Sequence, residues 1–215
     1  RELKEYCDNV GIDFCSTPFS AEEADLLAEL EVPFYKIASM DINNHRLLKH
    51  VASKDKPVIL STGMATLGEI ENAIETVTSS GNDKIVLLHC ISIYPPEYPD
   101  IHLNNIPMLK QTFGYPVGFS DHTIGYSIPL AAVALGACLV EKHFTTDKNL
   151  EGWDHEISAN SMEMEIIVRE SANIKTAMGS HRRVVSAAEK EKKKKFRRSI
   201  VAARSMKKGH IIADD

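Results

Sequence analysis

Two histidines have residue types and a spacing that are suited to metal chemistry. His122 and His143 each follow a short apolar segment typical of a strand, and one segment rich in Ala and Leu lies between them. If the two strands are parallel neighbours, both imidazoles lie at the same end of a sheet. Neutral imidazole is a common ligand of divalent transition metals. The pair therefore predicts an open, catalytic metal site, and the alternative is two unrelated strand-end histidines.

Polar side chains also gather at the ends of the other expected strands, where parallel α/β folds form their active sites. A lysine supplies a point charge for phosphate or carboxylate, and hydroxyl groups donate hydrogen bonds to the same anion. Each residue alone also fits a surface or turn position, but together they predict a site for an oxygen-rich anion such as phosphate. The set comprises Thr17, Lys36, Ser39, Ser61 and Ser120, and Ser92 and Tyr94 follow another strand.

Two acidic side chains lie close in sequence to the histidines. Glu141 shares a strand face with His143, whereas Lys142 points to the opposite face because neighbours in a strand alternate. Asp154 lies in the loop 151–155 after the last expected strand, and is suited to binding sugar hydroxyls, to acid–base chemistry or simply to capping the loop. The proline-rich loop 94–99 is suited to lining a substrate entrance.

The elements that must position these residues alternate between strands and helices. Short, mostly apolar strands are typical of parallel sheets that are covered on both faces. Six repeated strand–helix units indicate a parallel α/β sheet, either closed or doubly wound, and the lack of a Gly-x-Gly-x-x-Gly fingerprint after any strand disfavours a dinucleotide-binding fold. An eight-stranded TIM barrel takes about 250 residues, so we expect a barrel that lacks its first two strands here. The expected strands are 13–19, 34–39, 57–62, 84–90, 117–120 and 138–143, and the expected helices are 1–10, 20–30, 44–52, 67–77, 127–135 and 162–178.

Composition limits the class of protein. The chain has 215 residues and a net charge of −5, so no global feature suggests nucleic-acid binding. No apolar run reaches the roughly 18 residues of a membrane span, and the first residues do not resemble a signal peptide. The four cysteines form no Cys-x-x-Cys pair, so we expect buried free thiols in a cytoplasmic protein. The chain begins without Met, so we expect it to be a segment of a longer protein.

The character of the chain changes after Gly179. Residues 181–198 are polar and include a lysine run that a glutamate interrupts, which favours a solvated linker over a nucleic-acid patch. Residues 199–203 are predicted to form a strand, followed by a turn at 207–210. We therefore expect a partial barrel domain at 1–180, a linker at 181–198 and the start of a small β-rich domain at 199–215.

Several short motifs occur in a fixed order: STPFS at 16–20, YKIAS at 35–39, LSTGM at 60–64, LHC at 88–90, IYP at 93–95, FSDHT at 119–123 and EKHFT at 141–145. As a set they closely resemble the sialic acid synthase family of N-acetylneuraminate, legionaminate and pseudaminate synthases and spore-coat polysaccharide relatives. The resemblance runs over nearly the whole chain. It implies an eight-stranded β/α barrel followed by a small antifreeze-like (SAF) domain, in a homodimer in which that domain caps the partner's barrel.

The resemblance also implies a reaction. Phosphoenolpyruvate condenses with an open-chain N-acetylated amino sugar, such as N-acetylmannosamine, to give a sialic-type acid, and phosphate is released. A divalent metal, manganese above magnesium or cobalt, is implied at His122 and His143, where it polarises the sugar aldehyde. By motif position, the phosphoenolpyruvate contacts are Thr17, Lys36, Ser39, Ser61 and Ser120, with Ser92 where relatives often have Asn. Tyr94 and Asp154 match sugar contacts.

Three functions remain open at this point. A sialic-acid-type synthase is the first choice, and we expect its acid–base glutamate upstream of Arg1, so that this segment alone has little activity. Another metal-dependent barrel aldolase or phosphoenolpyruvate-condensing enzyme is the second. A non-catalytic sugar- or anion-binding barrel is the third.

Overall fold

A five-stranded parallel sheet forms the centre of the first of two structural units, which comprises Arg1–Met178, and the second unit begins at Gly179. The computed structural model describes residues 1–152 and 154–211. Each strand pairs with the next along the chain, which confirms the expected α/β class. The strands are β1 (Tyr35–Ile37), β2 (Val58–Ser61), β3 (Ile85–Cys90), β4 (Val117–Asp121) and β5 (Val140–Lys142).

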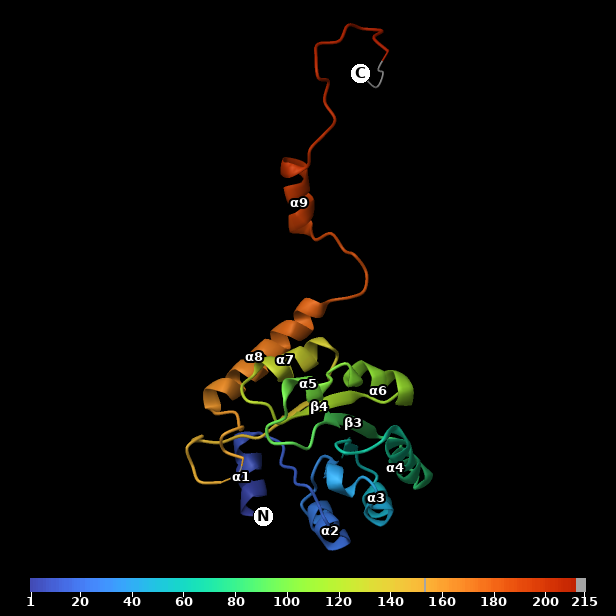
Figure 1. Cartoon of the computed structure of the whole chain (residues 1–215), viewed down its shortest axis with the longest axis vertical. Coiled ribbons are helices and arrows are strands. Elements are labelled where there is room, and N and C mark those ends of the chain that lie inside the picture. Colours follow the sequence, from blue (N-terminus) through green and yellow to red (C-terminus); the bar gives the residue numbers. More distant parts are fainter. Residues whose placement is uncertain (153, 212–215) are drawn as a thin grey trace. The chain divides into compact units, whose positions relative to one another are not determined.

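Helices of the first unit lie in an arc around the strands (Figure 1). Several begin at a side-chain cap: Thr66 and Glu69 form a reciprocal capping box at one helix, and Asn44 accepts the Leu47 N–H at another. Asn160 and Glu163 exchange the same kind of bonds at the longest helix. The helices are α1 (Glu2–Val10), α2 (Ala21–Glu29), α3 (His45–Ala52), α4 (Leu67–Ser79), α5 (Tyr98–Ile101), α6 (Asn105–Phe113), α7 (Ser127–Ala134) and α8 (Ser161–Met178), with a 3-10 turn at Ser39–Asp41.

Alternation along each strand divides the sheet into two faces. One face packs against the helices and carries apolar side chains that form the hydrophobic core. The residues between them belong to the other, inner face, where the site residues stand. The core members on the strands are Tyr35, Ile37, Val58, Leu60, Ile85, Leu87, Val117 and Phe119.

The sheet is strongly curled, so that its two edge strands approach each other. Lys36 on β1 and Glu141 on β5 form an ion pair with an Nζ–Oε2 distance of 3.2 Å. Neighbouring strands lie about 4.8 Å apart, so in a flat sheet β1 and β5 would be separated by about 19 Å, beyond the reach of the two side chains. The strands therefore form part of a barrel wall, in agreement with the expected architecture.

Three details differ from the sequence expectations. Residues 13–19 form no strand, since their polar residues and Pro18, which has no N–H to donate, disfavour a ladder. All four cysteines are free, as expected, but of the four only Cys90 is buried, whereas Cys7 and Cys15 are half-buried and Cys138 is exposed. Residues 100–113, which lie outside the expected helices and strands, contain the end of α5 and the whole of α6.

The second unit contains helix α9 (Ala187–Phe196), which lies within the stretch expected to be a linker. Ser186 and Glu189 form a capping box at its start, and this local pairing explains why a lysine-rich segment is helical. Residues 199–203 do not form the expected strand, because no strand among the described residues of this unit is present to pair with them. Part of the expected small domain, residues 212–215, lies outside the described residues.

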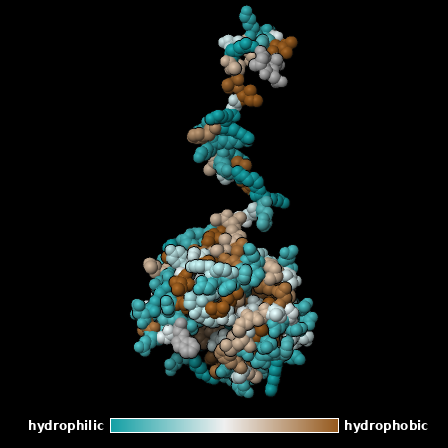
Figure 2. Space-filling model, in the orientation of Figure 1, coloured by the Kyte–Doolittle hydropathy of each residue, from teal (hydrophilic) through white to brown (hydrophobic). Residues whose placement is uncertain are grey.

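Surface polarity is mixed on the face of the first unit seen in Figure 2, whereas the α9 segment is mostly hydrophilic. Helix α1 has no buried residue and exposes Leu3, Tyr6 and Val10. In the part of the chain that the structure describes, no helix is both long and apolar enough to cross a membrane.

Gly118 provides a test of the close packing between β4 and the segment that leads into β5. A Cβ at this position would lie 2.6 Å from the Leu139 carbonyl oxygen and 2.7 Å from Leu88 Cδ2. We expect Gly118→Ala to lower the free energy of unfolding by about 1–3 kcal/mol, since backbone cannot move aside cheaply. Gly68→Ala on α4 is the matched control, because a Cβ there meets nothing within 4 Å and helix propensity improves. Urea unfolding of both variants measures the difference, and equal stabilities would contradict the prediction.

Candidate active site

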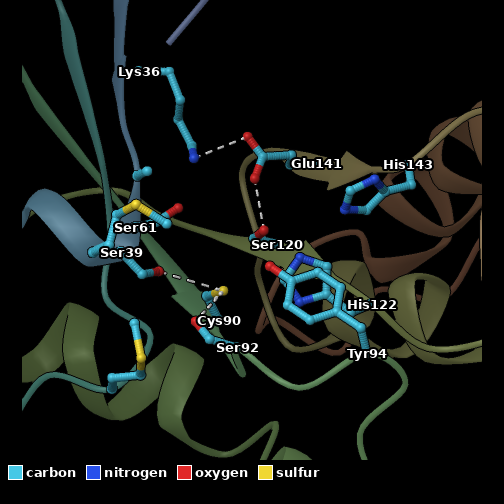
Figure 3. A pocket seen from close by; sticks show the side chains of 13 residues that line it. Lys36, Ser39, Ser61, Cys90, Ser92, Tyr94, Ser120, His122, Glu141 and His143 are labelled. Atoms are coloured by element: carbon cyan, nitrogen blue, oxygen red, sulfur yellow. Dashed lines mark hydrogen bonds and ion pairs between the residues drawn. The ribbon is translucent and has the colours of Figure 1, made fainter. Parts of the chain in front are cut away.

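A cavity of about 350 Å³ opens on the inner face of the sheet, at the carboxyl ends of the strands (Figure 3). Its position follows from the fold, because the polar residues that end parallel strands meet at one edge of the sheet. Eight residues selected from the sequence line it: Lys36, Ser39, Ser61, Ser92, Tyr94, Ser120, His122 and His143.

One side of the cavity has the character of an anion site. Lys36 supplies a cation, and the hydroxyls of Ser39, Ser61 and Ser92 line the same wall. The Ser61 hydroxyl is buried and has no hydrogen-bond partner among the described residues, although buried polar groups normally have one. This hydroxyl is therefore free to donate to a ligand.

Gly63 allows these hydroxyls to come together. Its N–H donates to Ser39 Oγ at 3.0 Å. A Cβ on Gly63 would lie 2.3 Å from Ser92 Oγ and 2.7 Å from Ser39 Oγ, so a larger residue would occupy the space between them. The glycine keeps this wall open for a ligand.

Glu141 links the anion side to the β4–β5 side of the cavity. Its carboxylate pairs with Lys36 through one oxygen and accepts a hydrogen bond from Ser120 Oγ at 2.6 Å through the other. Ser120 and Glu141 are direct partners in the β4–β5 ladder, which explains the short contact. An arriving anion would compete with Glu141 for both Lys36 and Ser120.

The two histidines stand beside this group, with ring centroids 5.4 Å apart. The Tyr94 ring lies 4.0 Å from the His122 ring and 5.8 Å from the His143 ring, measured between centroids. Figure 3 shows the three rings together at one side of the cavity, away from Lys36. The expectation that the histidines are brought together by parallel neighbouring strands is confirmed by the β4–β5 pairing.

The surroundings of His122 favour a neutral imidazole with one nitrogen available. The Nδ1 atom lies 2.7 Å from the Ile91 carbonyl oxygen, which can only accept, so the proton is assigned to Nδ1 and the Nε2 lone pair is free. Burial lowers the pKa of His122 below its ordinary value; the Ile91 hydrogen bond opposes this shift, and the nearby His143 adds to it. A neutral ring held through its second nitrogen is the usual state of a metal-binding histidine.

A metal would therefore find two histidine ligands here. Within residues 1–152 and 154–211, no group of three or more His, Cys, Asp or Glu side chains gathers as a metal site. Two protein ligands leave several positions for water and substrate, which suits an open catalytic site better than a closed structural one. The residues present fit such a metal as a partial set of ligands.

Two predicted contacts lie outside the lining of this cavity. Thr17 is half-buried in the segment before α2. Asp154 is about half-exposed, and its carboxylate lies 3.7 Å from His143 Nδ1, next to residue 153, which is outside the described residues. Conversely, Glu141 and Cys90 line the cavity but were not selected as site residues. Strand alternation marked Glu141 as sharing a face with His143, but no sequence signal shows that it meets Lys36.

Comparisons with known proteins agree with this site. A model of the NeuB family matches residues 1–183. The chain is 46% identical over 214 residues to an uncharacterized protein of Methanocaldococcus jannaschii, covering 100% of this chain and 64% of that protein. It is 43% identical over 216 residues to the N,N'-diacetyllegionaminic acid synthase of Campylobacter jejuni, covering 100% of this chain and 65% of that synthase.

The fold is also similar to a solved structure, the N-acetylneuraminic acid (sialic acid) synthetase of Leptospira borgpetersenii in complex with citrate. The TM-score is 0.84 and the identity 39%, and the match covers 92% of this chain and 70% of that chain. The chain thus spans 64% and 65% of the length of the two sequence relatives. With the family model matched over residues 1–183 and the expected motifs around one cavity, the chain belongs to the NeuB family of sialic-acid-type synthases.

Proposed function

We propose that the whole protein condenses phosphoenolpyruvate with an open-chain N-acetylated amino sugar and releases phosphate, giving a sialic-type acid. The observation that carries this proposal is one cavity with two sides. One side is an anion wall formed by Lys36, Ser39, Ser61 and Ser92, and the other holds the histidine pair. A reaction between a phosphorylated enol and an aldehyde needs both halves within one site. Membership of the NeuB family supports the same reaction class.

The anion wall is suited to holding phosphoenolpyruvate. Lys36 would neutralise phosphate or carboxylate charge, and the free Ser61 hydroxyl would donate to it. Because the Lys36 side chain is only 12% exposed, its charge acts in a partly dry environment and is screened less by salt. Glu141 would hold Lys36 and Ser120 in place until the substrate arrives.

The histidine pair is suited to orienting the sugar aldehyde. His122 and His143 would hold a divalent metal, manganese above magnesium or cobalt, and when bound the metal would act as a Lewis acid on the aldehyde oxygen. Tyr94 lies against His122 and lines this side of the cavity. In the condensation, C3 of phosphoenolpyruvate forms the new bond to the aldehyde carbon, water adds to C2, and phosphate leaves from the tetrahedral intermediate. Capping of the site by a partner's SAF domain in a homodimer stays a prediction.

The experiment that tests the function is an assay of the full-length protein with phosphoenolpyruvate, manganese and a panel of aldoses. We expect phosphate release with N-acetylmannosamine or a related N-acetylated hexose. Release with arabinose 5-phosphate or erythrose 4-phosphate instead would favour another phosphoenolpyruvate-condensing enzyme. If none of the sugars gives phosphate release, a binding protein would be favoured and the proposal would be contradicted.

The anion wall is tested by Lys36→Gln. We expect the Kd for phosphoenolpyruvate to rise about tenfold or more, because a hydrogen bond from a charged group is lost at a partly buried site. Lys56→Gln is the control, since Lys56 Nζ donates to the Val32 carbonyl at 2.6 Å and does not line the cavity. Calorimetric titration gives both Kd values, and an unchanged Kd in Lys36→Gln would remove Lys36 from the substrate site.

The metal assignment is tested by His122→Ala combined with His143→Ala. We expect manganese binding, followed by electron paramagnetic resonance, to be lost because both protein ligands are gone. His45→Ala combined with His50→Ala on α3 is the matched control, since these rings bond Thr76 and Asp25 instead. Manganese binding that survives in the first double variant would overturn the assignment.

A further inference from the structure

We propose that a buried ion pair between Asp121 and Lys142 acts as a clamp that sets the position of the two histidines. Asp121 and Lys142 are positioning residues, because they face away from the cavity and do not line it. The role of the histidines as metal ligands rests on the proposed function. The clamp itself rests on contacts between β4, β5 and the loop after β4.

The strand pattern places the clamp directly behind the site. Asp121 and Lys142 are direct partners in the β4–β5 ladder, one position after the Ser120–Glu141 pair that faces the cavity. Each is the immediate chain neighbour of a histidine, Asp121 of His122 and Lys142 of His143. Alternation turns their side chains to the opposite face of the sheet, where both are essentially inaccessible, with exposures of 0% and 1%.

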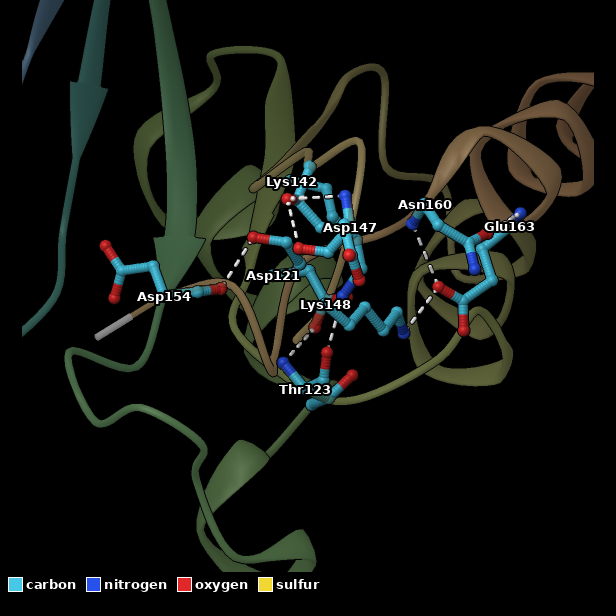
Figure 4. Close-up of polar contacts among 10 residues, drawn as sticks. Asp121, Thr123, Lys142, Asp147, Lys148, Asp154, Asn160 and Glu163 are labelled. Carbon is cyan, nitrogen blue, oxygen red and sulfur yellow. Dashed lines mark hydrogen bonds and ion pairs between the residues drawn. The ribbon is translucent and has the colours of Figure 1, made fainter. Parts of the chain in front are cut away.

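Lys142 contacts both Asp121 and Thr123, the two residues that flank His122 in the chain (Figure 4). Its Nζ lies 2.7 Å from Asp121 Oδ2, and it also donates to the Thr123 carbonyl. The second Asp121 oxygen accepts the Thr123 N–H at 3.0 Å. The residues on both sides of His122 are thus bonded to the Lys142 ammonium group, and Lys142 is itself the residue that precedes His143.

A buried ion pair is weak evidence for stability, because desolvation of two charges offsets much of their attraction. Apolar residues of similar volume often serve stability as well, so we attribute this pair to the geometry that it fixes. That geometry is the separation of two rings whose centroids lie 5.4 Å apart. A metal bound by only two protein ligands depends strongly on that separation, because no third side chain among the described residues compensates for an error.

The anion wall provides an internal reference. Lys36 lies on β1, Ser39 in the turn that follows β1, and Ser61 on β2. None of these three residues takes part in the contacts that form the clamp. Loss of the clamp should therefore affect the metal more than phosphoenolpyruvate. A general loss of stability would affect both together.

The test uses Asp121→Asn combined with Lys142→Met in the full chain. The variant removes both charges and keeps side-chain size, and the amide oxygen introduced at position 121 can still accept the Thr123 N–H. Asp121→Asn alone is the second variant if the double variant does not fold. The control is Lys148→Met combined with Glu163→Gln, which removes a 2.6 Å ion pair between the loop after β5 and α8 (Figure 4).

We expect manganese affinity, measured by electron paramagnetic resonance, to fall about tenfold or more in the clamp variant, as for other groups that orient metal ligands. At saturating manganese, the KM for phosphoenolpyruvate should change less than the manganese affinity, because most of the expected phosphoenolpyruvate contacts lie on other elements and Ser120 adjoins the clamp. In metal-free protein, the Thr123 amide should exchange with solvent faster than in the control. The clamp is overturned by wild-type manganese affinity and exchange, by an equal loss in the control, or by a parallel rise in the KM for phosphoenolpyruvate.

The amide-exchange measurement separates this proposal from the proposed function. If the unaltered full chain binds no manganese, the metal assignment fails, and the Thr123 exchange rate alone decides whether the clamp holds the β4 loop. Faster exchange would then still support the clamp, and unchanged exchange would overturn it.

Discussion

The curl of the parallel sheet is the constraint on which the arrangement of the site depends. The ion pair between Lys36 and Glu141 joins the two edge strands of a five-stranded sheet, and it can form only because the sheet curls. The same curl brings Ser39 and Ser61 opposite His122 and His143, and so makes one cavity from residues spread over more than a hundred positions of the chain. A parallel sheet with less curl would separate these two groups of residues, and neither group alone would form the complete site.

The two faces of the sheet divide the work of stability and chemistry. Outward residues such as Tyr35, Leu87 and Phe119 bury apolar surface against the helices and provide the main driving force for folding. Inward residues near the strand ends are polar, and their burial has a free-energy cost that hydrogen bonds largely offset. Asp121 and Lys142 are the exception, since they place a charged pair on the apolar side. Their position beside the histidines gives that exception a physical reason.

Preorganisation is visible in both halves of the cavity. The Ile91 carbonyl selects the tautomer of His122, and burial lowers the pKa of the ring, which favours a neutral imidazole with a free Nε2 lone pair. On the other side, Gly63 leaves space between Ser39 and Ser92, and Ser61 is left without a partner among the described residues. A site that keeps a buried hydroxyl unpaired is poised for a ligand that supplies the missing acceptor.

Much of the fold and of the site could be predicted from local patterns. Short apolar runs located the five strands, and their polar last residues identified Lys36, Ser120, His122 and His143, because strand ends in parallel folds converge for topological reasons. Residues 13–19 were predicted wrongly, since their polar residues and Pro18 disfavour a ladder. Alternation placed Glu141 and Lys142 on opposite faces of the sheet, but it did not identify the residues with which they pair. The Lys36–Glu141 pair depends on the curl of the sheet, and the Lys142–Asp121 pair depends on the register of β4 against β5. The local pattern along the chain thus determines which residues end each strand and which face they occupy. Distances between side chains on different strands depend instead on the register and the curl of the whole sheet.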